Sequence, residues 1–245
     1  MGVFSLVNAT VLYDGYDFSG DSNKLTLAAK VDELDSTTFT AAGAPSYHAR
    51  IGGLRDVELA LDGYWQSAAA NAVDPQVFPV LGAVDKPVTV SPDGAAGSVA
   101  YLAQMGKFAY DLGGSVGDIM PFTVDSMGTN GVGLVRGQVA AAKQSVSATG
   151  ALGSAVQLGA PTATQYVYAT FHVLSAGTTI TIQVQSDTAS NFPSPTTQAT
   201  IGPLTAQGGT WMTRVIGPFV GETWWRFNVS ALTGTFQVAG AIGVQ

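Results

Sequence analysis

Residues Asp14 to Trp65 read DGYDFSGDSNKLTLAAKVDELDSTTFTAAGAPSYHARIGGLRDVELALDGYW, and this stretch decides the fold class. Two segments near its ends, 24–31 and 56–62, alternate along their length. Leu25, Leu27, Ala29 and Val31 fall on one face of the first, opposite Lys24, Thr26, Ala28 and Lys30; Val57, Leu59 and Leu61 fall opposite Asp56, Glu58 and Asp62 in the second. A period of two predicts strands with one buried face. If the strands are neighbours, lysines meet carboxylates across them.

The segment between these strands, Asp32 to Gly53, is polar and rich in small residues. It is far too long for a tight hairpin turn. Long connections of this kind are usually functional or become ordered on contact. We therefore expect a long loop that reaches a neighbouring subunit.

The rest of the chain also predicts strands. Asp74-Pro75 resembles a helix start, with Asp at the N-cap and Pro at the first helical position, and Pro79 limits that helix to about two turns. The dipeptide Asn130-Gly131 lies between the β-prone runs 121–126 and 132–143 and predicts a hairpin. No alternation of strands with helices occurs, so we expect an all-β chain.

We divide the chain into an assembly domain of residues 1–150 and a C-terminal β-sandwich of residues 151–245. The stretch Val146 to Gly159 is rich in Ser, Ala, Gly and Thr and reads as a linker. Beyond it, short alternating segments separated by Gly and Pro turns are typical of a sandwich. His172 is expected on the outer face of one of these strands. The front domain is expected to be an antiparallel sandwich or barrel with the long loop and one short helix.

Charge is scarce and unevenly placed. Only 11% of residues are charged, against roughly 25% in an average domain. This composition fits a subunit whose surface is consumed by like copies; the alternative is simply a β protein rich in small residues. Residues 1–145 carry 8 basic and 15 acidic residues, and the remaining residues balance, so the net charge of −7 lies in the front. This acidic charge disfavours binding of DNA through its phosphates. It is compatible with an acidic channel past which DNA slides.

No chemistry of an enzyme is recognisable. The chain has no cysteine and two histidines, so a zinc site is not expected. The run Gly113–Gly117 matches G-x-S-x-G, but Pro121 soon follows and favours extended chain, so we expect a loop between strands. We expect no catalysis, no cofactor and no metal. The absence of a secretion signal and of any apolar run of membrane-spanning length predicts no membrane insertion.

Aromatic residues near the C-terminus open another possibility. Trp224 and Trp225 point to opposite faces of one predicted strand, so one is expected in the core and at most one can be exposed. An exposed Trp224 is a candidate glycan contact, because aromatic rings on a sandwich face can stack on sugars. Burial in the core or against a subunit is the commoner fate.

Four short stretches of the front part form a pattern: Tyr13–Asp21, Asp32–Phe39, Arg50–Asp56 and Gly63–Trp65. They resemble the major tail (tail tube) proteins of tailed bacteriophages, in which an acid–x–T–T–F strand and loop precede a G-G-L strand. The back part, with Thr178–Asp187, Gly202–Leu204 and Trp211–Arg226, resembles C-terminal β domains appended to phage structural proteins.

The resemblance implies a virion protein made in the host cytoplasm that forms stacked rings, commonly hexameric. It implies contacts with other tail proteins such as the tape measure and terminator, and DNA passing through without specific binding. Asp56, Glu58 and Asp62 are then lumen-facing candidates. Phe39, Tyr47, His48 and Arg50 are inter-subunit loop candidates. The large back domain leaves open a head-decoration or minor tail protein, or a carbohydrate-binding module on the virion surface.

Overall fold

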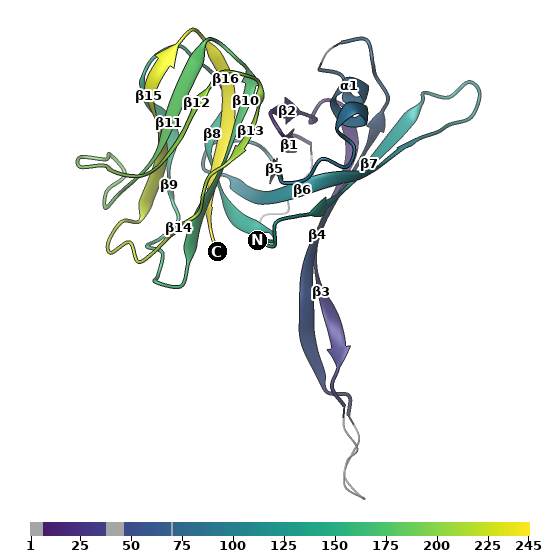
Figure 1. The fold of residues 1–245 in the computed structure, drawn as a ribbon, viewed down its shortest axis with the longest axis horizontal. Coiled ribbons are helices and arrows are strands. Elements are labelled where there is room, and N and C mark those ends of the chain that lie inside the picture. Colours follow the sequence, from purple (N-terminus) through teal and green to yellow (C-terminus); the bar gives the residue numbers. More distant parts are fainter. Residues whose placement is uncertain (1–6, 38–46, 70) are drawn as a thin grey trace, which may run out of the picture.

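The computed structural model describes residues 7–37, 47–69 and 71–245 (Figure 1). The described chain is built almost entirely of strands, with one short helix, α1 (Val73–Val77), and a 3-10 turn, η1 (Phe78–Val80). The strands are β1 (Thr10–Tyr13), β2 (Tyr16–Asp17), β3 (Ser22–Asp35), β4 (Arg50–Tyr64), β5 (Lys86–Ser91), β6 (Val99–Leu112), β7 (Pro121–Gly128), β8 (Val135–Val146), β9 (Gly150–Gln157), β10 (Tyr166–Ser175), β11 (Thr179–Asp187), β12 (Thr196–Leu204), β13 (Gly208–Trp211), β14 (Val215–Ile216), β15 (Trp224–Thr233) and β16 (Phe236–Val244). The predicted all-β fold class is confirmed.

Most strands belong to one large antiparallel sheet. Its path runs β13-β10-β16-β8-β6-β5-β1-β2 and curls until its two ends approach each other. The amide of Gly209, in β13, lies 3.2 Å from Oδ1 of Asp14, which follows β1. Curling into a nearly closed barrel covers strand edges that an open sheet would expose.

β6 is the strand around which this sheet branches. Tyr101 pairs with both β5 and β8, and Met105 pairs with both β5 and β7. β7 and β8 therefore lie one after the other along the same margin of β6. The predicted hairpin at Asn130-Gly131 is wrong: both residues have the positive φ of a tight turn, 62° and 65°, but the turn carries the chain from β7 to β8 without pairing them.

A second sheet, of order β12-β11-β15-β9, packs on the β8, β16 and β10 part of the large sheet. The large aromatic side chains Phe171, Trp225, Phe227 and Phe236 are fully buried between them. The stretch 146–159, predicted to be a linker, instead contains strand β9, because Leu152 and Val156 are buried in this core.

The large sheet crosses residue 150, since β8 pairs with β16. Residues 147–149 form the turn between β8 and β9. The division at residue 150 stays a prediction.

The long loop predicted over Asp32 to Gly53 is largely wrong. β3 continues to Asp35 and β4 begins at Arg50, and the two pair as far as Asp35 with Arg50. A register shift between Val31 and Glu33 accommodates the small residues that had suggested a loop. The result is an arm that projects from the body of the molecule (Figure 1).

Candidate functional site

The candidate site is the sheet formed by β3, β4, β7 and the C-terminal half of β6. One face of this sheet is apolar and packs on the front core. Val57, Leu59 and Leu61 of β4 and Phe122 and Val124 of β7 are each 1–3% exposed. The alternation that predicted these strands thus assigns the core face correctly, and it leaves the other face to polar residues.

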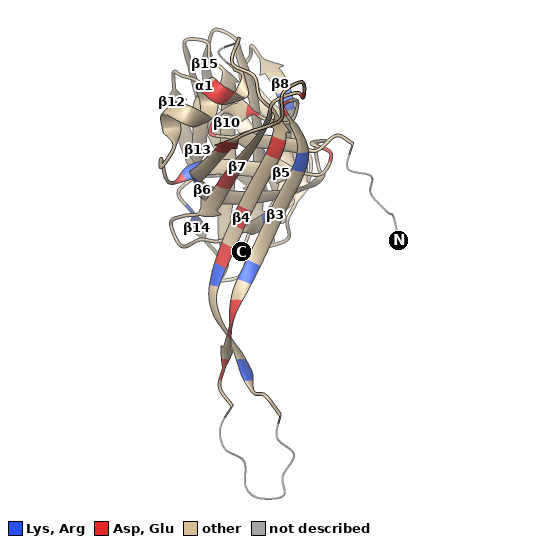
Figure 2. Ribbon diagram, turned by 90° about the vertical axis from the view of Figure 1, so that its right-hand side faces the viewer, with Lys and Arg blue, Asp and Glu red and all other residues tan. Residues whose placement is uncertain are grey.

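The polar face is rich in carboxylates (Figure 2). Asp56, Glu58 and Asp62 lie on β4 as the sequence predicts. Cross-strand pairing adds Asp125, opposite Ala60, and Asp111, opposite Thr123. Lys24 and Lys30 of β3 are the basic residues of this face. On the part of this face below the arm, these five carboxylates and two lysines give a net charge of −3.

Both lysines are engaged with β4. Lys24 Nζ lies 2.8 Å from Asp62 Oδ2, and Lys30 pairs with Glu58. Thr123 also donates to Asp62, at 2.7 Å. The hydrogen bonds from Lys24 and Thr123 hold the pKa of Asp62 below its ordinary value, so this carboxyl stays ionised. The predicted pairing of lysines with carboxylates is confirmed.

Both margins of this sheet are open within the described chain. β3 pairs with β4 alone, over its 14 residues. At the other margin, β5 and the Gly82 amide, which donates to the Lys107 carbonyl, cover β6 as far as Lys107. Residues Ala109 to Leu112 pair only with β7 among the described strands. Unpaired backbone groups on such margins are ready to pair with another chain.

The arm carries three of the four loop candidates in its described part. Arg50 forms an ion pair with Glu33, and His48 Nδ1 lies 3.1 Å from Asp35 Oδ2, so these two side chains brace the arm. Tyr47 is 78% exposed. Phe39 lies outside the described residues.

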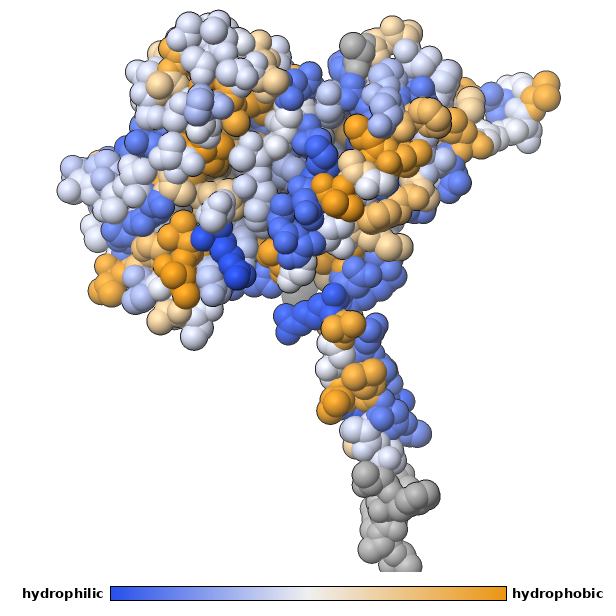
Figure 3. Space-filling model, viewed as in Figure 1, coloured by the Kyte–Doolittle hydropathy of each residue, from blue (hydrophilic) through white to orange (hydrophobic). Residues whose placement is uncertain are grey.

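Apolar side chains of the arm are also uncovered. Val31, Leu34, Ile51 and Leu54 are 49–80% exposed. Figure 3 shows hydrophobic surface along the arm. Exposed apolar residues gathered on one element mark a surface for another protein. The sequence placed Val31 on the buried face of a strand, and this prediction is wrong because no part of the described chain covers that face at the arm. Leu34 and Ile51 were missed because they fall within the expected loop.

Helix α1 closes one end of the front core. Val73 and Val77 are fully buried, and Asp74 accepts hydrogen bonds from Trp65 Nε1 at 3.2 Å and Tyr110 Oη at 3.1 Å. The helix begins at Val73, with Ala72 at the N-cap in place of the predicted Asp74. Asp74 therefore ties the helix to the sheet instead of capping it.

Lys107 lies beneath α1 and is 3% exposed. Its Nζ donates to the Gln76 carbonyl at 2.8 Å and lies 4.4 Å from the centre of the Tyr13 ring. Burial lowers the pKa of Lys107 to about 8. The hydrogen bond holds the helix to β6, and the cation–π contact holds β6 to β1.

The predicted outer position of His172 is wrong. The side chain is 0% exposed, and Gly15 N donates to Nδ1 at 3.2 Å while Nε2 lies 2.9 Å from Thr89 Oγ1. Since Nδ1 accepts, Nε2 carries the proton and donates to Thr89. Burial lowers the pKa of His172 to about 4, so the ring is neutral near pH 7.

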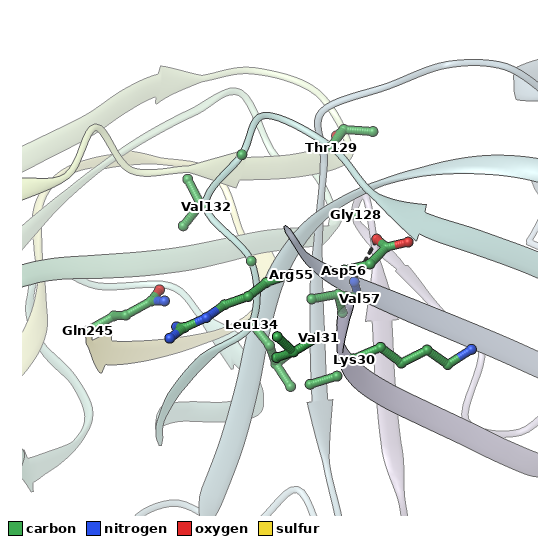
Figure 4. Close-up of a pocket in the computed structure, with 13 residues that line it drawn as sticks. Lys30, Val31, Arg55, Asp56, Val57, Gly128, Thr129, Val132, Leu134 and Gln245 are labelled. Atoms are coloured by element: carbon green, nitrogen blue, oxygen red, sulfur yellow. Dashed lines mark hydrogen bonds between the residues drawn. The ribbon is translucent and has the colours of Figure 1, made fainter. Parts of the chain in front are cut away.

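A groove of about 460 Å³ lies between the base of the arm and the connection from β7 to β8 (Figure 4). Val31, Val57, Val132 and Leu134 form its apolar wall. Its ionisable side chains are Lys30, Arg55 and Asp56; Lys30 is paired with Glu58, and Arg55 extends toward Gln245 (Figure 4).

Ser115 of the G-x-S-x-G match lies in an exposed turn between β6 and β7, as the sequence predicts, and not at a strand-to-helix elbow. Among the described residues there is no cluster of His, Asp and Glu that could hold a metal ion. No helix in the described ranges is both long and apolar enough to cross a membrane.

The glycan candidate Trp224 is partly buried on the outer face of the smaller sheet. Polar side chains follow it along this face. Arg226 Nε donates to Gln185 Oε1 at 3.0 Å, and Asn228 Nδ2 donates to Gln183 Oε1 at 3.3 Å. Trp225 is fully buried, so the predicted opposition of the two tryptophans is confirmed.

No protein-family model and no curated protein matches this chain. Solved structures that it resembles include one of the virion of a native gene transfer agent particle, with a TM-score of 0.42, 14% identity and coverage of 52% of this chain and 95% of that chain. Another is of the tail of an empty gene transfer agent particle with sixfold symmetry, with a TM-score of 0.36, 16% identity and coverage of 45% and 78%.

The Dit protein of phage SPP1, described as a hub adsorption apparatus of phages infecting Gram-positive bacteria, has a TM-score of 0.35, 9% identity and coverage of 97% of this chain and 99% of that chain. All three are proteins of virions, tails or adsorption apparatus. These TM-scores are too low to assign a shared fold or function, so we derive the function from the geometry of this chain.

Proposed function

We propose that this chain is a non-enzymatic structural protein of a tailed bacteriophage and that copies of it form stacked rings, which build the tail tube through which DNA passes. The observation that carries the proposal is the sheet β3-β4-β7-β6, which is open at both margins within the described chain. A sheet open on both sides can be continued by a copy of itself on each side.

The strand directions support this continuation. All neighbours in the sheet are antiparallel, so β3 and β6, three steps apart, run in opposite directions. If β3 of one copy lies beside β6 of the next, the antiparallel alternation continues across the seam with every copy in the same orientation. A head-to-tail contact of this kind closes into a ring when the rotation allows, and closure removes both free edges. We expect rings of six copies, by the family resemblance.

The polar face then becomes the inner wall. The opposite face is occupied by the front core, which places the core and the back sandwich outside the ring. A wall with a net charge of −3 per copy repels phosphates and lets DNA pass without specific binding. Asp56, Glu58 and Asp62 are the proposed lumen residues, joined by Asp111 and Asp125.

The arm supports stacking of the rings. It projects beyond the body at the end of the sheet opposite the β6–β7 turn (Figure 1). Contact with the next ring would remove its exposed apolar residues from water, which favours stacking. Other tail proteins, such as the tape measure and terminator, are the proposed partners inside and at the end of the tube. The proposed location is the virion, after synthesis in the host cytoplasm.

A second candidate function is carbohydrate binding by the back sandwich, as in a decoration or minor tail protein. The observation that favours it is the ordered face of Trp224, Arg226, Asn228, Gln183 and Gln185, which offers one aromatic ring beside planar hydrogen-bonding groups. Titration of chitotriose into the chain, with Trp224→Ala as the matched variant, tests this function. A chain that binds the sugar but forms no ring would favour it over the tube.

Sedimentation velocity and negative-stain microscopy of the purified chain over a concentration series test the proposed tube. We expect rings or tubes with a central hole at high concentration. A compact monomer or trimer at every concentration would contradict the proposal.

A further inference from the structure

An apolar patch flanks the free margin of β6. Phe78, Leu81, Val84 and Phe108 are 40–65% exposed. They lie together because the segment after η1 crosses β6: Gly82 N donates to the Lys107 carbonyl at 2.8 Å, and a Cβ on Gly106 would meet the Ala83 carbonyl at 3.1 Å. Figure 3 shows hydrophobic side chains gathered beside β6 and below α1. We call these four residues the β6 patch.

A groove flanks the opposite margin of the same sheet. It measures about 270 Å³ and is lined by residues of β1 and the segment before it, and by the start of β3. Its apolar lining is Val7, Ala9, Val11 and Leu25, and Ser22 and Asn23 form part of its rim. We call it the β3 groove. The patch and the groove thus flank opposite margins of the sheet, β6 and β3. Figure 2 shows these two strands on opposite sides of the sheet.

We propose that the β6 patch of one copy seats in the β3 groove of the next and that this contact locks the lateral seam of the ring. The inference rests on the proposed function, because the occupant is a second copy of this chain. It adds to edge pairing a side-chain contact, with Phe78 as the residue that enters the groove.

Three features make a second copy the fitting occupant. Pairing β3 with the free margin of β6 brings the patch and the groove to the same seam, since each flanks one of the two edges. Both surfaces are apolar at their centre, so contact removes both from water. On the polar face, the seam brings Lys24 and Lys30 of β3 beside the β6 that carries Asp111, so opposite charges meet.

The seam accounts for why the patch is exposed in a single copy. Phe78 is 65% exposed although its neighbour Val77 is fully buried. The sequence places Phe78 beside Pro79, where η1 turns the ring away from the core. A bulky aromatic residue held outward by a rigid turn loses little freedom on docking.

Phe78→Asp tests the contact, with Val220→Asp as the control. Val220 is 88% exposed in the back sandwich, so the control adds the same charge away from the seam. We expect Phe78→Asp to raise the concentration needed for ring formation by roughly 10- to 100-fold, which is the effect of losing the burial of one large apolar side chain. Sedimentation velocity measures this concentration, and circular dichroism checks that both variants remain folded.

The chain has no cysteine, so engineered pairs report contacts without background. We expect the double variant Phe78→Cys, Asn23→Cys to form a ladder of covalent oligomers on mild oxidation, reversed by a reductant. The matched double variant Val220→Cys, Asn23→Cys is expected to stay monomeric on the same gel.

The outcomes separate this inference from the proposed function. Rings of the parent chain with a shifted Phe78→Asp variant and a ladder from the 78/23 pair support the seam. Rings without either effect would overturn the seam and leave the ring standing. A parent chain that forms no ring would overturn both.

Discussion

The front sheet and the back sandwich are both built from antiparallel strands, but they differ in how their sheet edges are covered and where their charges lie. The front sheet leaves the outer edge of β3, a strand of 14 residues, without a partner in the described chain, and its polar face carries most of its charges. In the smaller back sheet, edge strand β12 carries Pro203 and register shifts against β11, which blunt an edge. The other edge, β9, folds back on β8, where a Cβ on Gly153 would meet the Ala140 carbonyl at 2.0 Å.

This difference favours the front sheet over the back sandwich as the surface for the proposed contacts between copies. The outer face of the back sheet satisfies its polar groups internally, through Arg226, Gln185, Asn228 and Gln183. Residues 146–245 carry no net charge. In a single copy, the front sheet leaves backbone hydrogen-bonding groups unpaired at its margins and apolar side chains exposed. We therefore expect substitutions in the front sheet to alter assembly without changing the free energy of unfolding. Substitutions in the back core are expected to lower the free energy of unfolding without acting on assembly directly.

The largest effect is expected from shortening the arm. Replacement of residues 32–54 by Asn-Gly joins Val31 to Arg55, which are paired in β3 and β4, through a two-residue turn that suits a hairpin. Rings are expected to form but not to stack, because the arm that reaches the next ring is gone. Electron microscopy counts the tubes, and an unchanged melting temperature is the control for folding. Tubes of ordinary length would show that the arm has no part in stacking.

The next largest effect is expected in the back core. Trp225 is 0% exposed, and Trp225→Ala is expected to lower the free energy of unfolding by about 3–5 kcal/mol, since it leaves a cavity. Trp224→Ala, on the partly exposed face of the same strand, is the control and is expected to cost less. Urea denaturation measures both. Equal losses from the two variants would contradict the assignment of Trp225 to the core.

Acid is expected to destabilise the chain through His172. Its folded pKa of about 4 lies below the ordinary value of 6.5. The unfolded chain binds the extra proton between these values, so stability falls as pH decreases from 6.5 to 4, by roughly 3 kcal/mol in total. His172→Gln lacks this group, and its loss of stability over the same window is expected to be smaller by that amount. Parallel pH profiles for the two proteins would contradict the buried neutral histidine.

The smallest effect on stability is expected on the polar face. The triple variant Asp56→Asn, Glu58→Gln, Asp62→Asn removes exposed or partly exposed charges, so the free energy of unfolding should change by no more than about 1 kcal/mol. Assembled tubes of this variant are expected to retain DNA at low salt, because the wall no longer repels phosphates.

The control for that experiment is Asp85→Asn, Asp93→Asn, Asp118→Asn, which changes the charge equally but away from the polar face. Filter binding at several salt concentrations measures both variants. Equal retention of DNA by both would attribute the effect to net charge and not to the proposed lumen face.

The local pattern of the sequence was sufficient for strands with one buried face. Leu59 and Leu61 fell on the core side as predicted, and Lys24 met Asp62. The same alternation runs through Ala109 and Asp111 and through Thr123 and Asp125, and it could have added these acids to the face. The pairing of β6 with three other strands was not predictable, because it depends on contacts distant in the sequence.

Two errors have different physical causes. β10 separates the sandwich core from the interior of the barrel, so both of its faces are buried and the polar residues Thr170 and His172 lie inside. Alternation shows which residues share a face but not what covers that face. The arm was missed because Gly52 and Gly53, beside a register shift, resemble a loop.

Cryo-electron microscopy of the assembled chain tests the central claim most directly. We expect a ring in which β3 of each copy lies antiparallel to β6 of its neighbour, with Asp56, Glu58 and Asp62 facing a central hole and the back sandwich outside. A ring joined through the back sandwiches, or one with these carboxylates on its outer surface, would contradict it.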